Sequence, residues 1–202
     1  PKPNSPVAGG RMFQDKHGDL RAANITPDQS TGIGGWSVTE FVHALRSHLG
    51  PNEEELSTEV HAGYAWMSDP DLLAVAAYLR SLPPVRNAVD RRKLGFVSRN
   101  TTGILESRLE MEGYVPSIDP KFTTEYGKYL VDHVAQCGGC HNGKPGMFSS
   151  GGYLVGGRAI RIDGAERTAP NITQSREAGL GDWNEQELLT FLRTGVTAEN
   201  RS

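Results

Sequence analysis

Apolar side chains recur at helical spacing in four stretches of this chain, whereas the alternating pattern of a strand is scarce. Two of these stretches begin in the same way: Ser37 is followed by Glu40, and Asn184 is followed by Glu187. Each pair has the residue types of an N-cap and an N3 position, whose side chains satisfy free amides of the first helical turn. The pattern therefore predicts a helix after each pair, in a mainly α chain.

The other two helical stretches lie between these. Ser68-Asp69-Pro70 supplies a capping residue and a proline for the first turn of one helix, and Pro83-Pro84 ends it. A further helix is predicted from about Thr124 to Gln136, directly before the cysteines. The 24 glycines and 12 prolines among 202 residues predict long, turn-rich loops between the helices.

The chain repeats itself with a period of 147 residues and without a gap. For example, Asn24 recurs as Asn171 and Trp36 as Trp183, because 171 − 24 and 183 − 36 both equal 147. The motifs found twice in this register are Asn24–Thr26 with Asn171–Thr173, Leu45-Arg46 with Leu192-Arg193, and Gly9–Arg11 with Gly156–Arg158. Several matches in one register indicate an internal duplication.

The repeat predicts tandem domains joined by a linker. We expect residues 1–85 to form the C-terminal part of a first domain and residues 120–202 the N-terminal part of a second. Residues 86–119 are charged, with scattered apolar positions, and we interpret them as a linker that packs partly on the domains. Both domains are expected to be incomplete, since the equivalent of Cys137 in the first copy falls before Pro1.

The two cysteines of the chain lie in one motif, Cys137-Gly138-Gly139-Cys140-His141. Four uses are open: covalent attachment of haem c, a zinc site, a dithiol redox centre, and a structural disulfide or spectator thiols. Haem c is favoured because two thiols at this spacing add to the two vinyl groups of one porphyrin, while the next imidazole ligates the iron. Zinc is less favoured, since the other histidines have no paired spacing that completes four ligands.

The charge and hydropathy of this chain argue against a nucleic-acid partner and against a membrane-spanning segment. The formal net charge is −3, without the clustered positive charge that phosphate binding needs, so we predict no nucleic-acid partner. No apolar run approaches the roughly 18 residues that cross a bilayer, so we predict no transmembrane segment in this chain.

The order of these motifs resembles the class I cytochrome c domain. Its front part is similar to the series YLV, CGGCH, GGR, APNIT, GLGDW and LLTFLRTG, and its back part to ANITPDQSTGIGGW followed by MSDPDLLAVAAYLRSLPPV. The whole arrangement is similar to the diheme or multihaem c-type cytochromes that serve as electron-accepting subunits of bacterial periplasmic dehydrogenases.

The resemblance implies a role for several residues of the second copy. Cys137 and Cys140 form the haem thioethers, and His141 is the proximal iron ligand. The carbonyl of Pro170 accepts a hydrogen bond from the other ring nitrogen of His141. Candidates to bind the haem propionates are Arg158 and Trp183.

The distal iron ligand departs from the family pattern. The family places a methionine shortly before the segment YAWMSD, but residues 56–60 are Leu, Ser, Thr, Glu and Val. The nearest candidates are Met67 and His61. A second haem is expected to be attached upstream of Pro1.

The resemblance also implies a partner and a location. Electrons come from a dehydrogenase subunit and pass to a downstream cytochrome, the quinone pool or an oxidase, in the periplasm or another extracytoplasmic compartment. The chain is then an electron carrier rather than an enzyme. Two alternatives stay open: a haem-free structural or docking domain, and a dithiol oxidoreductase that uses Cys137 and Cys140.

Overall fold

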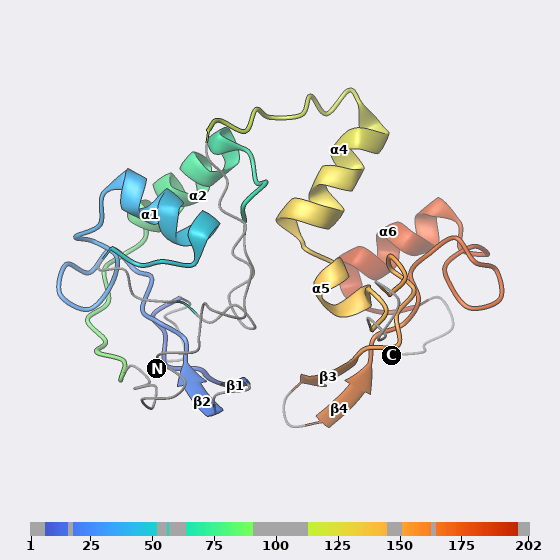
Figure 1. The fold of residues 1–202 in the computed structure, drawn as a ribbon, viewed down its shortest axis with the longest axis horizontal. Coiled ribbons are helices and arrows are strands. Elements are labelled where there is room, and N and C mark those ends of the chain that lie inside the picture. The colour runs from blue at the N-terminus through green and yellow to red at the C-terminus, as the bar shows by residue number, and fades with distance from the viewer. Residues whose placement is uncertain are drawn as a thin grey trace. The chain divides into compact units, whose positions relative to one another are not determined.

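A computed structural model describes residues 7–15, 18–51, 56, 64–90, 113–144, 151–162 and 165–197 (Figure 1). The chain divides into two compact units, unit 1 with residues 1–134 and unit 2 with residues 135–202. In the described residues, more lie in helices than in strands, as the sequence predicts. None of the described helices is long and apolar enough to cross a membrane.

Unit 1 begins with a hairpin and continues with the first two predicted helices. Strands β1 (Met12–Asp15) and β2 (Gly18–Arg21) pair antiparallel. Helix α1 (Val38–Ser47) has the predicted capping box: Glu40 N–H donates to Ser37 Oγ at 3.1 Å, and Ser37 N–H donates to the Glu40 carboxylate at 2.7 Å. Helix α2 (Asp69–Ser81) is capped by Ser68, as predicted.

The core of unit 1 lies where α1 packs on α2 (Figure 1). Phe41 of α1 and Ile33 of the preceding loop cluster with Ala76 and Leu79 of α2. Leu72 is fully buried. Burying one large aliphatic or aromatic side chain contributes about 1.5–3 kcal/mol, so this small cluster is the main source of cohesion for the two helices.

A third helix of unit 1 is anchored to the start of α2. The predicted helix from Thr124 to Gln136 is α4 (Thr123–Tyr129) followed by a π-helical turn, η1 (Leu130–Val134). The Tyr129 hydroxyl is buried, accepts a hydrogen bond from Ser68 N–H at 3.1 Å and donates to the Asp71 carboxylate. Burial, together with the bond to Asp71, raises the pKa of Tyr129.

The two described ends of the predicted linker pack on unit 1. Asn87 N–H donates to Thr31 Oγ1 at 2.9 Å. Val115 N–H donates to the Asp69 carboxylate at 2.7 Å, and Asp69 N–H donates back to the Val115 carbonyl at 2.9 Å. The bond from Val115, with a further contribution from Arg46, lowers the pKa of Asp69 despite its desolvation.

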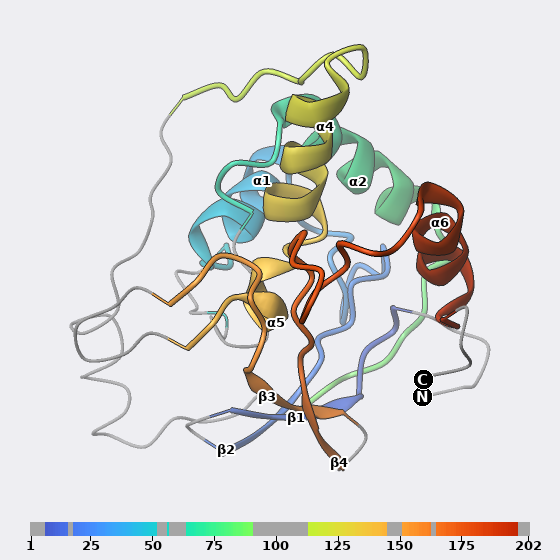
Figure 2. The same cartoon turned by 90° about the vertical axis from the view of Figure 1, so that its right-hand side faces the viewer.

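Unit 2 repeats the hairpin and the first helix of unit 1. It contains α5 (Gly138–His141), a hairpin of β3 (Ala159–Ile162) and β4 (Ala165–Thr168), and α6 (Glu185–Thr194), as seen in Figure 2. The bounds of β3, β4 and α6 lie 147 residues after those of β1, β2 and α1. The predicted capping box of Asn184 and Glu187 is present.

Neither hairpin was predicted from the sequence. Each strand is four residues long. A strand of that length places two side chains on each face, so its alternation is too short to stand out from a loop. The sequence prediction of a mainly α chain therefore lacks two short hairpins that the structure adds.

The duplication also preserves backbone conformations that are rare for residues with a side chain. Val7 and Leu154 have φ of +64° and +58° and lie 147 residues apart. At the end of the repeated helix, His48 and Gly195 have φ of +55° and +72°. Left-handed backbone is unfavourable for a β-branched residue such as valine, so its recurrence marks a turn that both copies require.

Candidate functional site

The two cysteines lie on a single helical turn. Cys137 is the N-cap of α5, and His141 N–H donates to the Cys137 carbonyl at 2.9 Å. Both residues are free thiols; Cys137 is half-buried and Cys140 is exposed. Because positions three apart share one face of a helix, the turn presents both thiols on the same side.

The imidazole of His141 contacts Pro170, the residue that the family resemblance implies. His141 Nδ1 lies 2.8 Å from the Pro170 carbonyl oxygen. A carbonyl only accepts, so Nδ1 carries a proton, and in the neutral imidazole Nε2 then keeps its lone pair. This is the tautomer and orientation that a metal-ligating histidine with an outer hydrogen bond adopts.

A loop from 151 to 158 holds the backbone of the motif from the other side. Gly156 N–H donates to the His141 carbonyl at 2.6 Å. Gly156 has φ of +73°, and a Cβ at this position would lie 2.5 Å from the carbonyl carbon of Pro170. Only glycine therefore lets this loop contact His141 and the segment of Pro170 at once.

Asn142 is a structural residue of the site that the sequence did not single out. Leu154 N–H donates to Asn142 Oδ1 at 2.9 Å, which ties the loop to the end of α5. A Cβ on Gly138 would lie 2.6 Å from Asn142 Nδ2, whereas a Cβ on Gly139 would meet nothing within 4 Å. Thus a side chain at position 138 would displace the Asn142 amide, whereas Gly139 faces open space. An asparagine directly after the motif has no spacing signal that would have revealed this.

The two propionate candidates differ in their surroundings. Arg158 is exposed, and its Nη1 donates to the Gly139 carbonyl at 2.7 Å. That bond uses one of the five N–H donors of a guanidinium. Trp183 is half-buried, with its ring edge-on to Phe191 at 5.5 Å and 88°. The binding of propionates by either side chain stays a prediction.

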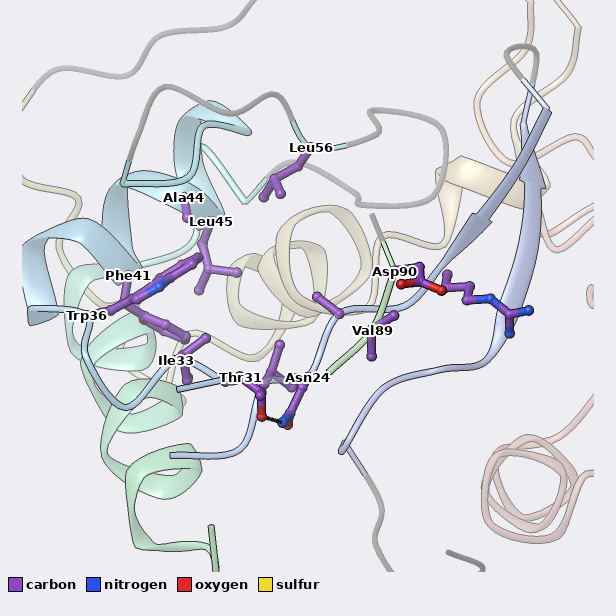
Figure 3. A pocket seen from close by; sticks show the side chains of 14 residues that line it. Asn24, Thr31, Ile33, Trp36, Phe41, Ala44, Leu45, Leu56, Val89 and Asp90 are labelled. Atoms are coloured by element: carbon purple, nitrogen blue, oxygen red, sulfur yellow. Dashed lines mark hydrogen bonds between the residues drawn. The ribbon is translucent and has the colours of Figure 1, made fainter. Parts of the chain in front are cut away.

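Unit 1 contains an apolar pocket of about 180 Å³. Figure 3 shows Ile33, Trp36 and Phe41 grouped at one end, with Val89 and Asp90 toward the other. Within its polar edge, Asn24 Nδ2 donates to Thr31 Oγ1 at 3.1 Å. The remaining lining residues are Arg21, Ala23, Ile25, Gly32, Ala44, Leu45 and Leu56.

The apolar positions of this pocket are apolar in unit 2 as well. Adding 147 to Ile25, Ile33, Trp36, Phe41, Ala44 and Leu45 gives Ile172, Leu180, Trp183, Leu188, Phe191 and Leu192. In unit 1 Phe41 is 6% exposed, whereas its equivalent Leu188 is 36% exposed and Leu192 is 73% exposed. Unit 2 thus presents a repeated apolar wall that the described residues of this unit leave open.

Of the two distal-ligand candidates, the structure describes Met67. Met67 is buried in unit 1, and its backbone carbonyl accepts from Arg46 Nη2 at 3.1 Å. Arg46 also forms an ion pair with Asp69 at 2.8 Å, which fixes the start of α2 next to Met67. His61 lies outside the described residues. In the described part of the chain, no group of three or more His, Cys, Asp or Glu could hold a metal ion.

Comparison with known proteins relates nearly the whole chain to one class of subunit. It is 30% identical over 204 residues to the fructose dehydrogenase cytochrome subunit of Gluconobacter japonicus, a match that covers 97% of this chain and 41% of that subunit. It is 29% identical to the gluconate 2-dehydrogenase cytochrome c subunit of Pantoea cypripedii, over 96% of this chain and 46% of that subunit. A diheme cytochrome c-type protein of Cereibacter sphaeroides is 28% identical over 96% of this chain and 64% of its own length.

These relatives confirm the family resemblance that the motifs indicate. The chain spans less than half of the length of the two dehydrogenase subunits. No protein-family model matches it.

Proposed function

We propose that this chain, which is homologous over nearly its whole length to cytochrome c subunits of bacterial dehydrogenases, transfers electrons through a covalently bound haem c. The observation that carries the proposal is the bond of 2.8 Å between His141 Nδ1 and the Pro170 carbonyl. His141 directly follows Cys140, the second of two free thiols. This bond leaves Nε2 of His141 available as a ligand, and the two thiols share a face of α5.

The residues of unit 2 suit such a group in their chemistry. Cys137 and Cys140 would hold the porphyrin by thioethers, and His141 would ligate the iron. Haem supplies a one-electron iron couple whose potential depends on axial ligands, burial and hydrogen bonds. The repeated apolar wall, which includes Leu188 and Leu192, offers the contact surface that a large apolar ring needs.

A second haem, attached by residues outside this chain, is proposed for the pocket of unit 1. Its support is a second copy of the glycine cradle. Gly9 has φ of +80°, and a Cβ there would lie 2.6 Å from the carbonyl carbon of Ala23. Ala23 lines the pocket and is the equivalent of Pro170, whose carbonyl holds His141. This shared backbone arrangement supports a site for another imidazole in unit 1. Met67 is our candidate for a distal ligand there, and His61 is the alternative.

The relatives support a proposal about the cellular role. We propose that the chain accepts electrons from a dehydrogenase subunit in the periplasm and passes them to a respiratory acceptor, such as a further cytochrome, the quinone pool or an oxidase. In this role its own residues hold and tune the haem, and the substrate chemistry belongs to the partner.

The test is a redox titration of the chain produced in a periplasm with haem-attachment machinery. The proposal expects a haem spectrum that is reduced and reoxidised reversibly by one electron, and that changes in His141→Ala. A chain without a redox-active chromophore, with two thiols that alkylating reagents modify, would instead support the dithiol oxidoreductase or a purely structural role.

A further inference from the structure

Arg158 forms a hydrogen bond to the backbone of the cysteine motif. Its Nη1 donates to the carbonyl of Gly139 at 2.7 Å, between the two thiols. Other bonds to the motif come from backbone or ring, among them Gly156 N–H to the His141 carbonyl and His141 Nδ1 to the Pro170 carbonyl. Arg158 thus adds a charged donor to the turn itself.

The equivalent arginine of the first copy has other surroundings. It is Arg11, and its guanidinium lies over the ring of Phe13, 5.5 Å from the centroid. The residue that corresponds to Phe13 in unit 2 is Ile160, which has no ring. The counterpart of Gly139 in the first copy falls outside this chain, since 139 − 147 = −8. The contact with the Gly139 carbonyl is therefore seen in the copy whose cysteine motif this chain contains.

The bond reaches a glycine of the turn. A Cβ on Gly139 would meet nothing within 4 Å, so this residue has open space on that side. Its N–H donates to the Gln136 carbonyl at 2.9 Å, which restrains the backbone of the turn. A hydrogen bond from a charged donor is stronger than one from a neutral donor, although exposure weakens it. The Arg158 bond therefore adds a side-chain restraint to the backbone bonds of the turn.

We propose that Arg158 is a positioning residue of the haem site: it holds the turn between Cys137 and Cys140 through the Gly139 carbonyl and keeps a fixed positive charge beside that turn. The inference rests on the proposed function, because the charge matters only for a group that changes its own charge. A nearby positive charge favours the reduced state of the iron, which carries one positive charge less.

The experiment compares Arg158→Gln with Arg158→Lys and with Arg167→Gln in the haem-loaded chain. Arg167 is an exposed arginine on β4 of the same hairpin, so its replacement removes the same charge without removing the bond to Gly139. The readouts are the midpoint potential and the amount of covalent haem per chain, which are measured alongside the folded fraction.

A partly exposed unit charge shifts the equilibrium of a neighbouring charged group about fivefold. For Arg158→Gln we therefore expect the ratio of reduced to oxidised protein to fall about fivefold at a fixed potential. This equals a decrease of about 40 mV in the midpoint potential, at 59 mV per tenfold for one electron. Arg158→Lys keeps the charge and a donor, so it should restore at least half of the shift. Arg167→Gln should shift the potential by less than half as much.

Equal shifts in Arg158→Gln and Arg167→Gln would overturn the proposal, because they would show a general charge effect. No shift in Arg158→Gln would overturn it as well. If the unsubstituted chain carries no haem, the proposed function itself fails, and this outcome is visible before any variant is made.

Discussion

Gly156→Ala tests whether the close approach of two loops holds the imidazole of His141. A Cβ at Gly156 would lie 2.5 Å from the carbonyl carbon of Pro170, and ordinary contacts begin at 3.4 Å. The loops must therefore separate by 3.4 − 2.5 = 0.9 Å. Because His141 bridges the two loops, the separation is counted once: carried by one bond, it lengthens either Gly156 N to His141 O from 2.6 to 3.5 Å or His141 Nδ1 to Pro170 O from 2.8 to 3.7 Å. Either value exceeds the usual hydrogen-bond range.

The expected cost follows from the lost bond and the backbone. Each bond contributes about 1 kcal/mol, and left-handed backbone costs a residue with a side chain about 1–2 kcal/mol. Because one of the two bonds is lost, Gly156→Ala should lower the free energy of unfolding of unit 2 by about 2–3 kcal/mol. Gly157→Ala is the matched control: φ is +83°, but a Cβ there meets nothing within 4 Å, so about 1 kcal/mol is expected.

The assay is urea unfolding of the haem-loaded chain, followed by haem absorbance because the motif lies in unit 2. The haem spectrum of the folded variants is recorded in parallel, since a released His141 should change the ligand field. If Gly156→Ala and Gly157→Ala cost the same and leave the spectrum unchanged, the clamp does not hold the imidazole.

Three further predictions concern unit 1 and the repeated turns. Hydrogen bonds, first among them the one from the Thr31 hydroxyl, hold the pKa of Asp28 at about 2, below its ordinary 3.8. The loop should therefore be fully stabilised above pH 3.8 and lose this stabilisation as the pH falls through about 2. An NMR titration of the loop measures this. Tyr129→Phe should cost about 1–3 kcal/mol in urea unfolding of unit 1, because buried Ser68 N–H loses its acceptor. At the repeated left-handed position, His48→Gly should stabilise unit 1 by about 1 kcal/mol and Gly195→Ala should destabilise unit 2 by a similar amount, measured by the same method.

The elements with local sequence signals were predicted well. The capping residues Ser37, Ser68 and Asn184 each begin a helix where the pattern places one, since a cap is decided by neighbours within four residues. The interval of 147 residues predicted equivalent helices, and the structure extends it to the hairpins. The pairing of His141 with Pro170 was expected from the family resemblance, and the two residues do lie together.

Other features depend on contacts between distant segments and had no local signal. The π-helical turn after Tyr129 interrupts a helix that the apolar pattern predicts as continuous. The need for glycine at position 156 arises from its approach to Pro170, which lies 14 residues away. One signal for this was present: Gly9 and Gly156 recur at the repeat interval, and a glycine kept in both copies indicates a required backbone approach. Asn142 and the partner of Arg158 required the structure.

The central claim is that Cys137, Cys140 and His141 hold a haem. The most direct measurement is the intact mass of the purified chain, with a pyridine haemochrome spectrum and a haem stain after denaturing electrophoresis. The account predicts one covalent haem per chain, which survives denaturation and is lost or reduced to a single thioether in Cys140→Ala. A chain with the mass of the polypeptide alone and two alkylatable thiols, recovered from cells that attach haem to a known c-type cytochrome, would contradict it.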